Sequence, residues 1–112
     1  NLDQMLPKNP IPSLLHGDLW EGNILFNNEK IVGFIDPGVH FGHNELEIAY
    51  LTWFKYVNNE FLNYYSDIIN IDKYYKKYEP IYQLYYCLLN VHLWDREYIN
   101  NINELIKKIL KN

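Results

Sequence analysis

Cysteine is almost absent from this 112-residue chain, and long hydrophobic runs are missing. The single cysteine, Cys87, cannot form an internal disulfide and predicts a packing thiol in a reduced, cytoplasmic protein. The longest apolar neighbourhood, residues 81–94, is interrupted by polar side chains and is too short to span a bilayer. The first fifteen residues carry three prolines and do not have the pattern of a signal peptide. We therefore expect a soluble protein that does not bind a membrane.

Positive charge is also scarce. Ten lysines and arginines stand against fourteen acidic residues, which gives a net charge of -4. This balance argues against a broad electrostatic surface for nucleic acid or anionic lipid. What the chain does contain is apolar material, with 48% hydrophobic and 17% aromatic residues. At this length it can bury one core, so we expect residues 1–112 to form a single domain.

Glycine and proline are unevenly distributed. All five glycines and four of the five prolines lie in residues 1–44. This pattern predicts an irregular lead-in over residues 1–13, followed by loops and a β-hairpin over residues 14–44. The expected hairpin strands are residues 23–26 and 30–35, joined by a turn at Asn27 and Asn28.

The rest of the chain, residues 45–112, has apolar residues at helical spacing and predicts a small helical bundle. We expect a helix over 45–57, a short helix that buries its apolar residues, a segment capped by Asp72 that ends at Glu79, a longer helix that begins at Pro80, and a last helix capped by Asp95. The apolar residues of the short helix are Phe61, Leu62, Tyr65, Ile68 and Ile69. The predicted fold class is α+β and mainly helical, with a short hairpin beside four or five helices.

The most informative stretch is HGDLWEGN, residues 16–23. It fits the pattern H-x-D-L-x-x-x-N of kinase catalytic loops, in which the aspartate accepts the proton of the substrate hydroxyl and the asparagine holds magnesium. Asp18 and Asn23 occupy these positions. A second aspartate, Asp36, leaves the end of the second hairpin strand into a Pro-Gly turn, where kinases place a further magnesium ligand.

Each of these pieces alone is common turn chemistry. Their order within about twenty residues, with the hairpin between them, favours a phosphotransferase that uses Mg²⁺ and ATP. His16 is expected to orient the loop through a backbone hydrogen bond and not to act as a base.

Three segments together resemble the fructosamine kinase (ketosamine 3-kinase) family, a branch of the aminoglycoside phosphotransferase and protein-kinase-like fold. They are HGDLWEGN, IDPGVHFGHNELEIAYL and IYQLYYCLLNVHLWDREY. The resemblance runs from about Leu14 to Leu110. It implies the carboxy-terminal lobe of such an enzyme, with the hairpin carrying the catalytic and metal loops.

The resemblance also implies roles for particular residues. Asp18 matches the family's catalytic base, Asn23 and Asp36 match its metal ligands, and Trp20 matches a position that helps shape the sugar-amine pocket. The implied reaction is ATP-dependent phosphorylation of the 3-hydroxyl of a ketosamine, which leads to deglycation. A related kinase acting on an aminoglycoside, choline or another hydroxyl acceptor is the alternative enzyme class, and a non-catalytic interaction module is the alternative outside enzymes.

The glycine-rich loop, the strand lysine and its glutamate partner, which such a fold uses to hold ATP, have no counterpart in this sequence. The amino-terminal lobe is therefore expected to be absent. We expect a truncated form, a domain of a longer enzyme or half of a split kinase, with a partner chain or self-association covering the exposed surface.

Two further groups of polar residues have two interpretations each. His92, with Asn90, could point toward the acceptor pocket or form a semi-buried polar pair, and the sequence favours neither.

His40 and His43, near two glutamates, could be drawn as a zinc site. The favoured interpretation is structural, with the glutamates stabilising a helix start and its neighbouring loops. Those glutamates are Glu45 and Glu47.

Overall fold

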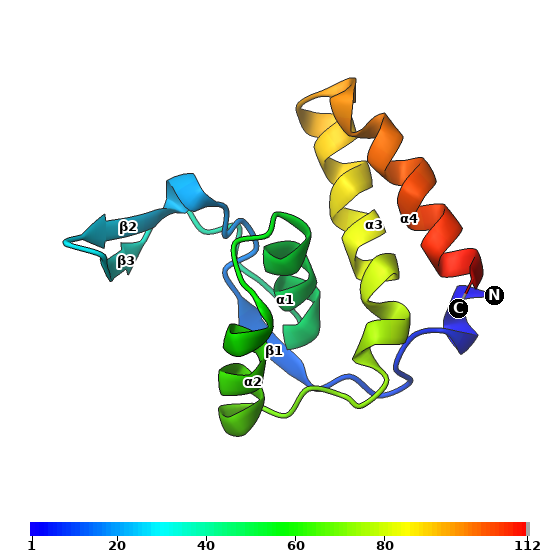
Figure 1. Ribbon diagram of the computed structural model, residues 1–112, viewed down its shortest axis with the longest axis horizontal. Coiled ribbons are helices and arrows are strands. Elements are labelled where there is room, and N and C mark those ends of the chain that lie inside the picture. The colour runs from blue at the N-terminus through cyan, green and yellow to red at the C-terminus, as the bar shows by residue number, and fades with distance from the viewer. Residues whose placement is uncertain (112) are drawn as a thin grey trace.

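The computed structural model describes residues 1–111, which form a mixed and mainly helical fold, as predicted. Two two-stranded antiparallel sheets lie on one side, and helices form the rest (Figure 1). Within these residues no helix combines the length and apolarity that a membrane crossing needs. The α-helices (α), 3-10 helices (η) and strands (β) in chain order are η1 (Leu2–Gln4), β1 (Pro12–Leu15), η2 (Glu21–Asn23), β2 (Ile24–Asn27), β3 (Lys30–Phe34), β4 (His40–His43), α1 (Asn44–Trp53), α2 (Asn59–Ile68), α3 (Tyr75–Leu93), η3 (Arg96–Tyr98) and α4 (Ile99–Lys111).

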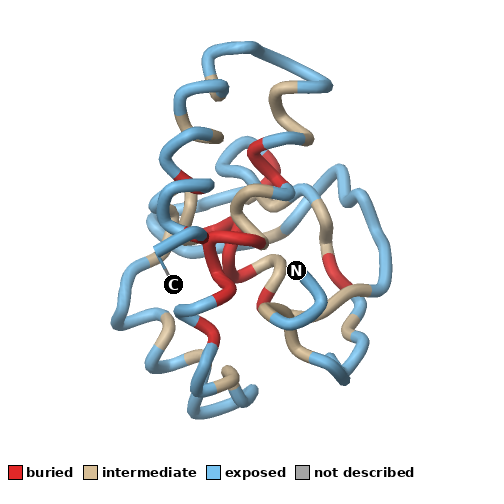
Figure 2. The backbone as a smooth tube through the Cα atoms, turned by 90° about the vertical axis from the view of Figure 1, so that its right-hand side faces the viewer, coloured by how far each residue is buried: buried red, intermediate tan, exposed pale blue. Residues whose placement is uncertain are grey.

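Helix α3 is the centre of the packing. It lies antiparallel to α4 on one side and contacts α1 on the other (Figure 1). The buried residues gather where these helices meet (Figure 2). They form two clusters, and α1 contributes to both because its buried face is wide. The first cluster contains Ile48, Tyr75, Tyr78, Ile81 and Ile109, and the second contains Tyr50, Leu51 and Tyr86.

The predicted break before Pro80 is wrong, because α3 runs through it without interruption. Asp72 does cap the start of this helix, with its Oδ1 accepting the N–H of Tyr74 at 2.7 Å. Pro80 lies five residues after the helix begins and removes one helical N–H donor. Burial of Tyr78 and Ile81 on either side stabilises the continuous helix and outweighs that loss.

Helix α1 ends at Trp53, earlier than the predicted residue 57. Lys55 has a φ of 59°, and its N–H donates to the Thr52 carbonyl at 3.1 Å. The N–H of Tyr56 donates to the Leu51 carbonyl at 3.0 Å. This pair of bonds closes the helix in a Schellman arrangement, which usually has glycine at the left-handed position. With lysine there, the sequence gives no visible stop signal.

Side-chain caps begin α2 and η3, the short 3-10 helix that precedes α4. The Asn58 side chain accepts the N–H of Phe61 at 3.0 Å and begins α2. Asp95 accepts the N–H of Glu97 at 3.0 Å and caps η3, which leads directly into α4, as predicted. The predicted burial of α2 is wrong, because none of its residues is buried. Only its inner face, with Leu62 and Tyr65, packs against the first cluster, and the remaining apolar side chains face outward.

The hairpin between β2 and β3 is confirmed, but its turn lies one residue later than predicted. Asn28 and Glu29 occupy the turn with φ values of 48° and 63°, and Asn27 pairs with Lys30. Positive φ at both positions matches the twist of a two-residue hairpin.

The sheet of β1 and β4 was not predicted, and its first strand begins inside the segment expected to be irregular. Pro12 pairs with His43, and Leu15 pairs with His40. The two sheets have a direct consequence for the loops between them. Residues 16–23 connect β1 to β2, and residues 35–39 connect β3 to β4. Since β1 pairs with β4 and β2 with β3, these two loops must run side by side.

Candidate active site

The two loops touch at a pair of glycines. Gly17 has a φ of +82°, and a Cβ placed on it would lie 2.1 Å from the Gly38 carbonyl oxygen. A side chain at Gly17 would therefore be strained and would clash with the opposite loop. The ring of His40 lies on the same contact, with Nδ1 at 2.9 Å from the Gly38 oxygen. The catalytic loop and the Asp36 loop are thus in backbone contact.

Asp18 and Asn23 are joined across the first loop. The Asn23 side chain is buried, and its Nδ2 donates to the Asp18 backbone carbonyl at 2.8 Å and to the carboxylate Oδ2 at 3.1 Å. Its amide oxygen has no hydrogen bond within residues 1–111 and is not fully buried. An uncommitted amide oxygen beside a carboxylate is the donor chemistry that Mg²⁺ prefers.

Asp36 is held through the peptide that precedes it. The N–H of Ile35 donates to the Asn23 carbonyl at 3.0 Å, and the Ile35 carbonyl accepts from His16 Nε2 at 2.9 Å. Asp36 itself has a φ of 48°, a conformation that costs an ordinary residue about 1 kcal/mol and that aspartate tolerates better than most. The chain therefore directs this exposed carboxylate by backbone contacts to the Asn23 loop.

His16 bridges the two loops with both ring nitrogens. Nε2 bonds the Ile35 carbonyl, and Nδ1 accepts the N–H of Asp18 at 3.3 Å. These two partners assign the neutral tautomer with the proton on Nε2. With both nitrogens engaged, His16 has no atom available as a base.

Glu47 on α1 holds the start of the same loop. Its Oε1 accepts the N–H of Gly17 at 2.7 Å, and its Oε2 accepts the N–H of His16 at 3.2 Å. The sequence placed this glutamate near a helix start and neighbouring loops without indicating which loop. The only feature of the sequence that could have indicated this contact is the number of residues between Glu47 and the Asp-Pro-Gly turn that precedes it.

Glu45 serves a different part of the fold. Its buried carboxylate accepts the N–H of Asp72 at 2.6 Å and the hydroxyl of Tyr78, and it lies 3.7 Å from Nδ1 of His43. The carboxylate therefore ties α1 to the start of α3. Within the described part of the chain, no three histidine, cysteine or acidic side chains converge to hold a metal ion.

The two predicted substrate residues lie in different surroundings. Trp20 is 43% exposed, and its indole covers Gly22, where a Cβ would lie 2.1 Å from the ring. His92 is exposed in the last turn of α3, and among residues 1–111 no hydrogen bond, ion pair or ring contact links it to Asp18, Asn23 or Asp36. The structure therefore brings Trp20 to the catalytic loop and leaves His92 outside that group.

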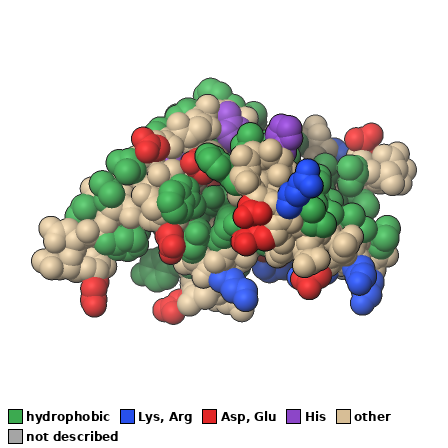
Figure 3. All heavy atoms as spheres, turned by 90° about the horizontal axis from the view of Figure 1, so that it is seen from above, with side chains coloured by type: hydrophobic (Ala, Val, Ile, Leu, Met, Phe, Trp, Pro, Cys, Tyr) green, Lys and Arg blue, Asp and Glu red, His purple; other side chains and the backbone are tan. Residues whose placement is uncertain are grey.

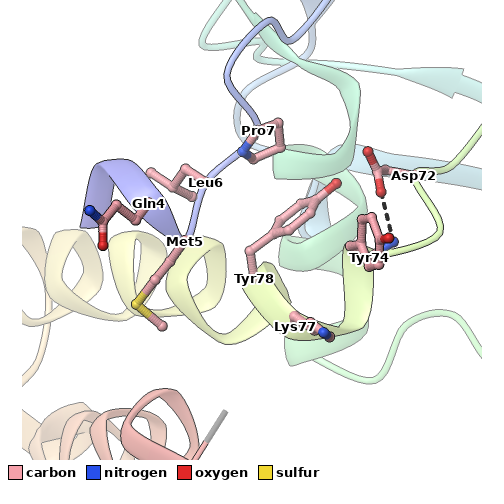
Figure 4. A pocket seen from close by; sticks show the side chains of 8 residues that line it. All are labelled: Gln4, Met5, Leu6, Pro7, Asp72, Tyr74, Lys77 and Tyr78. Carbon is pink, nitrogen blue, oxygen red and sulfur yellow. Dashed lines mark hydrogen bonds between the residues drawn. The ribbon is translucent and has the colours of Figure 1, made fainter. Parts of the chain in front are cut away.

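A cavity of about 460 Å³ lies away from these loops, between the amino-terminal segment and the start of α3 (Figure 4). Met5, Asp72, Lys77 and Tyr78 are among its lining residues, and none of the predicted site residues takes part. The candidate site lies instead in the two loops at the base of the hairpin. Hydrophobic side chains of that hairpin are exposed beside it (Figure 3).

Known proteins resemble this chain over nearly its whole length. It matches the family model for fructosamine kinase over residues 2–112. A probable ketoamine kinase of Enterococcus faecium is 38% identical over 106 residues, which cover 95% of this chain and 38% of that protein. A chloroplastic protein-ribulosamine 3-kinase of Arabidopsis thaliana is 33% identical over 102 residues, covering 89% of this chain and 30% of the relative.

A solved structure agrees with these matches. The crystal structure of a candidate fructosamine-3-kinase from Thermobifida fusca superimposes with a TM-score of 0.81 at 28% identity, over 99% of this chain and 38% of that one. This chain thus spans between 30% and 38% of the length of these relatives. By the family match and the fold together, the chain belongs to the fructosamine kinase family.

Proposed function

We propose that this chain is the carboxy-terminal, catalytic-loop part of an ATP- and magnesium-dependent ketosamine kinase with a protein-kinase-like fold. The observation that carries the proposal is the backbone of Ile35, whose N–H donates to the Asn23 carbonyl and whose carbonyl accepts from His16 Nε2. This peptide joins the Asp18 loop to Asp36. Phosphoryl transfer needs such a fixed arrangement, because most of its catalysis is positioning and charge neutralisation.

In this mechanism Asp18 accepts the proton of the acceptor hydroxyl as that oxygen bonds to the γ-phosphorus of ATP, while the bond from that phosphorus to the bridging oxygen breaks and ADP leaves. Asn23 keeps the Asp18 carboxylate in place through its Nδ2 hydrogen bond. The Asn23 amide oxygen and the Asp36 carboxylate would hold Mg²⁺, which neutralises charge on the phosphates when bound. His16 and Glu47 position the loops and take no part in proton transfer.

The proposed acceptor is a ketosamine, whose 3-hydroxyl is phosphorylated so that the adduct breaks down. The names of the relatives support this class over aminoglycosides or choline, since they refer to ketoamines and ribulosamines. Trp20 at the catalytic loop is proposed to border the sugar. The ATP-binding lobe is proposed to come from a longer form of the protein or from a partner chain.

The test is the substitution Asp18→Asn in a longer protein that contains this chain. We expect turnover of a ketosamine to fall about 10²- to 10⁴-fold, with the KM for ATP nearly unchanged, because Asp18 acts on the acceptor. Asp67→Asn, an exposed carboxylate on α2, is the matched control and should behave as the parent. Turnover of Asp18→Asn equal to that of Asp67→Asn would remove Asp18 from the mechanism.

A further inference from the structure

The tyrosines of the first cluster and its surroundings have hydroxyl partners within the protein. Each ring that packs there places its oxygen against a polar side chain, as buried phenols usually do. The pairs are Tyr65 with Asn44, Tyr75 with Glu79, Tyr78 with Glu45, and Tyr82 with His43. These hydroxyls are accounted for by the fold.

The second cluster differs. The rings of Tyr50 and Tyr86 are 6% and 2% exposed and pack edge to face with centroids 4.6 Å apart. Neither hydroxyl has a hydrogen-bond partner among residues 1–111. In the same residues no fully buried side-chain nitrogen or oxygen lacks a partner, so both hydroxyls must reach solvent. Two almost buried rings therefore keep uncommitted hydroxyls that touch solvent through small openings.

The cluster that holds these rings contacts the catalytic loop. Leu19, the neighbour of Asp18, packs directly against the cluster of Tyr50, Leu51 and Tyr86. Burial raises the pKa of Tyr50 and Tyr86; the charge of Asp18 raises that of Tyr50 further, and the charges of Glu47 and, to a smaller extent, Asp18 raise that of Tyr86. The acceptor hydroxyl must approach Asp18, and the cluster that holds these two phenols lies against the residue next to it.

If the rings of Tyr50 and Tyr86 only filled the core, phenylalanine would pack equally well at both positions. A phenol hydroxyl both donates and accepts a hydrogen bond, and on a buried ring it loses little conformational freedom when it binds. Two such groups, on rings whose centroids lie 4.6 Å apart, suit a ligand that carries several neighbouring hydroxyls. A sugar hydroxyl both donates and accepts, as a phenol does, whereas a phosphate dianion only accepts and an ammonium group only donates.

We propose that the hydroxyls of Tyr50 and Tyr86 bind the sugar hydroxyls of the acceptor beside Asp18 and thereby select a polyhydroxylated substrate, a role that rests on the proposed kinase function. The two tyrosines are specificity-determining residues in this scheme. Asp18 contacts the hydroxyl that is phosphorylated, and the two tyrosines contact other hydroxyls of the sugar.

The test is binding of a small ketosamine, N-(1-deoxyfructosyl)glycine, to the 112-residue protein, followed by the NMR signals of the tyrosine rings. We expect the signals of Tyr50 and Tyr86 to shift with the ligand and not with glycine alone. Each of Tyr50→Phe and Tyr86→Phe should raise the Kd about 2- to 10-fold, which is the usual effect of one lost hydrogen bond. Tyr64→Phe, an exposed tyrosine on α2, should leave the Kd unchanged.

A second measurement separates this role from a structural one. Because neither hydroxyl bonds the protein, both variants should keep the Tm of the parent, whereas Tyr75→Phe should lower it by losing its bond to Glu79. Absence of ketosamine binding, or parental Kd values in both variants, would overturn the proposal. Phosphoryl transfer is measured separately in a longer form: binding at Tyr50 and Tyr86 without any transfer of phosphate would overturn the kinase function and leave this sugar site standing.

Discussion

The carboxylate of Glu47 accepts the backbone N–H groups of both His16 and Gly17, at 3.2 and 2.7 Å. One side chain on α1 therefore fixes the peptide planes that lead into Asp18. Hydrogen bonds to a charged acceptor contribute about 1.5–3 kcal/mol each, so this contact is a strong restraint on the loop.

Glu47→Gln should loosen this loop, since the amide keeps one acceptor and turns the other into a donor that faces an N–H. We expect faster amide hydrogen exchange at His16 and Gly17 in the isolated chain. In a longer active form, kcat should fall about 10- to 100-fold, as expected for a misplaced catalytic group. Glu104→Gln, an exposed glutamate on α4, serves as the control. Unchanged exchange at both amides would show that the contact does not restrain the loop.

Asp36 should control the magnesium dependence of nucleotide binding. Asp36→Gly removes the carboxylate and suits the positive φ at this position, so it separates the metal role from the fold. We expect unfolding at the parental Tm or above, with weaker Mg²⁺-dependent nucleotide binding by calorimetry in a longer form. Parental magnesium dependence in Asp36→Gly would remove this residue from the metal site.

The buried tyrosines predict a loss of stability at alkaline pH. Burial, together with the charge of Glu45, raises the pKa of Tyr82 to about 12 from its ordinary value of 10.0. A raised pKa in the folded state means that the unfolded chain ionises first, so stability is intact below pH 10 and is lost as the pH rises toward 12. Burial raises the pKa of other tyrosines in the same direction: Tyr50, Tyr56, Tyr75, Tyr78 and Tyr86.

Urea unfolding between pH 8 and pH 12, followed by tyrosine absorbance, measures this effect. The midpoint should be constant below about pH 10 and then fall. Tyr82→Phe should show a shallower fall than the parent, while Tyr64→Phe should match it. A midpoint that is constant up to pH 12 would contradict the assignment.

The isolated 112-residue chain should bind ATP weakly and should not phosphorylate a ketosamine. The proposed base Asp18 and the proposed metal ligands Asn23 and Asp36 come without a phosphate loop in this sequence, and Mg²⁺ keeps its water at a site that is not pre-formed. Calorimetry with magnesium and ATP checks this expectation. Micromolar nucleotide binding by a monomer would show that the chain is sufficient without a further lobe.

The same chain should self-associate through its hairpin. Phe26 and Val32 are 59% and 62% exposed there, and neighbouring apolar side chains extend the patch. Light scattering should show association that decreases in the double variant Phe26→Ser, Val32→Thr. Leu110→Ser, at an exposed position on α4, is the control and should associate as the parent does. Equal association in the two variants would place the contact elsewhere.

The helices were predictable where apolar spacing and polar caps coincide, as at Asp95, whose cap and following helix are both present. The errors have local physical causes. Pro80 was interpreted as a first-turn residue, but packing on both sides keeps α3 continuous. Lys55 adopts a conformation usual for glycine, so the end of α1 could not be seen. The strand at Pro12 is defined by its partner at His43, which lies far away in sequence.

The candidate site was predictable as a set of residues and not as a geometry. Motif spacing predicts Asp18, Asn23 and Asp36 as a set, because the proposed chemistry requires that order along the chain, and their roles stay a prediction. It could not show that the Ile35 peptide joins them, since backbone bonds leave no pattern in the sequence. Nor could it distinguish Tyr50 from the many tyrosines that only pack, because that difference lies in the surroundings of one hydroxyl.

The placement of the hairpin has a consequence for how the chain can vary in length. The candidate site lies at the base of β2 and β3, where Ile24 pairs with Phe34, and the turn at Asn28 and Glu29 is the far end. Adding or removing residues in pairs at that turn would keep the pairing below it and leave the alternation of side chains unchanged. The hairpin tip is therefore a place where related chains could differ in length while their loops keep one geometry.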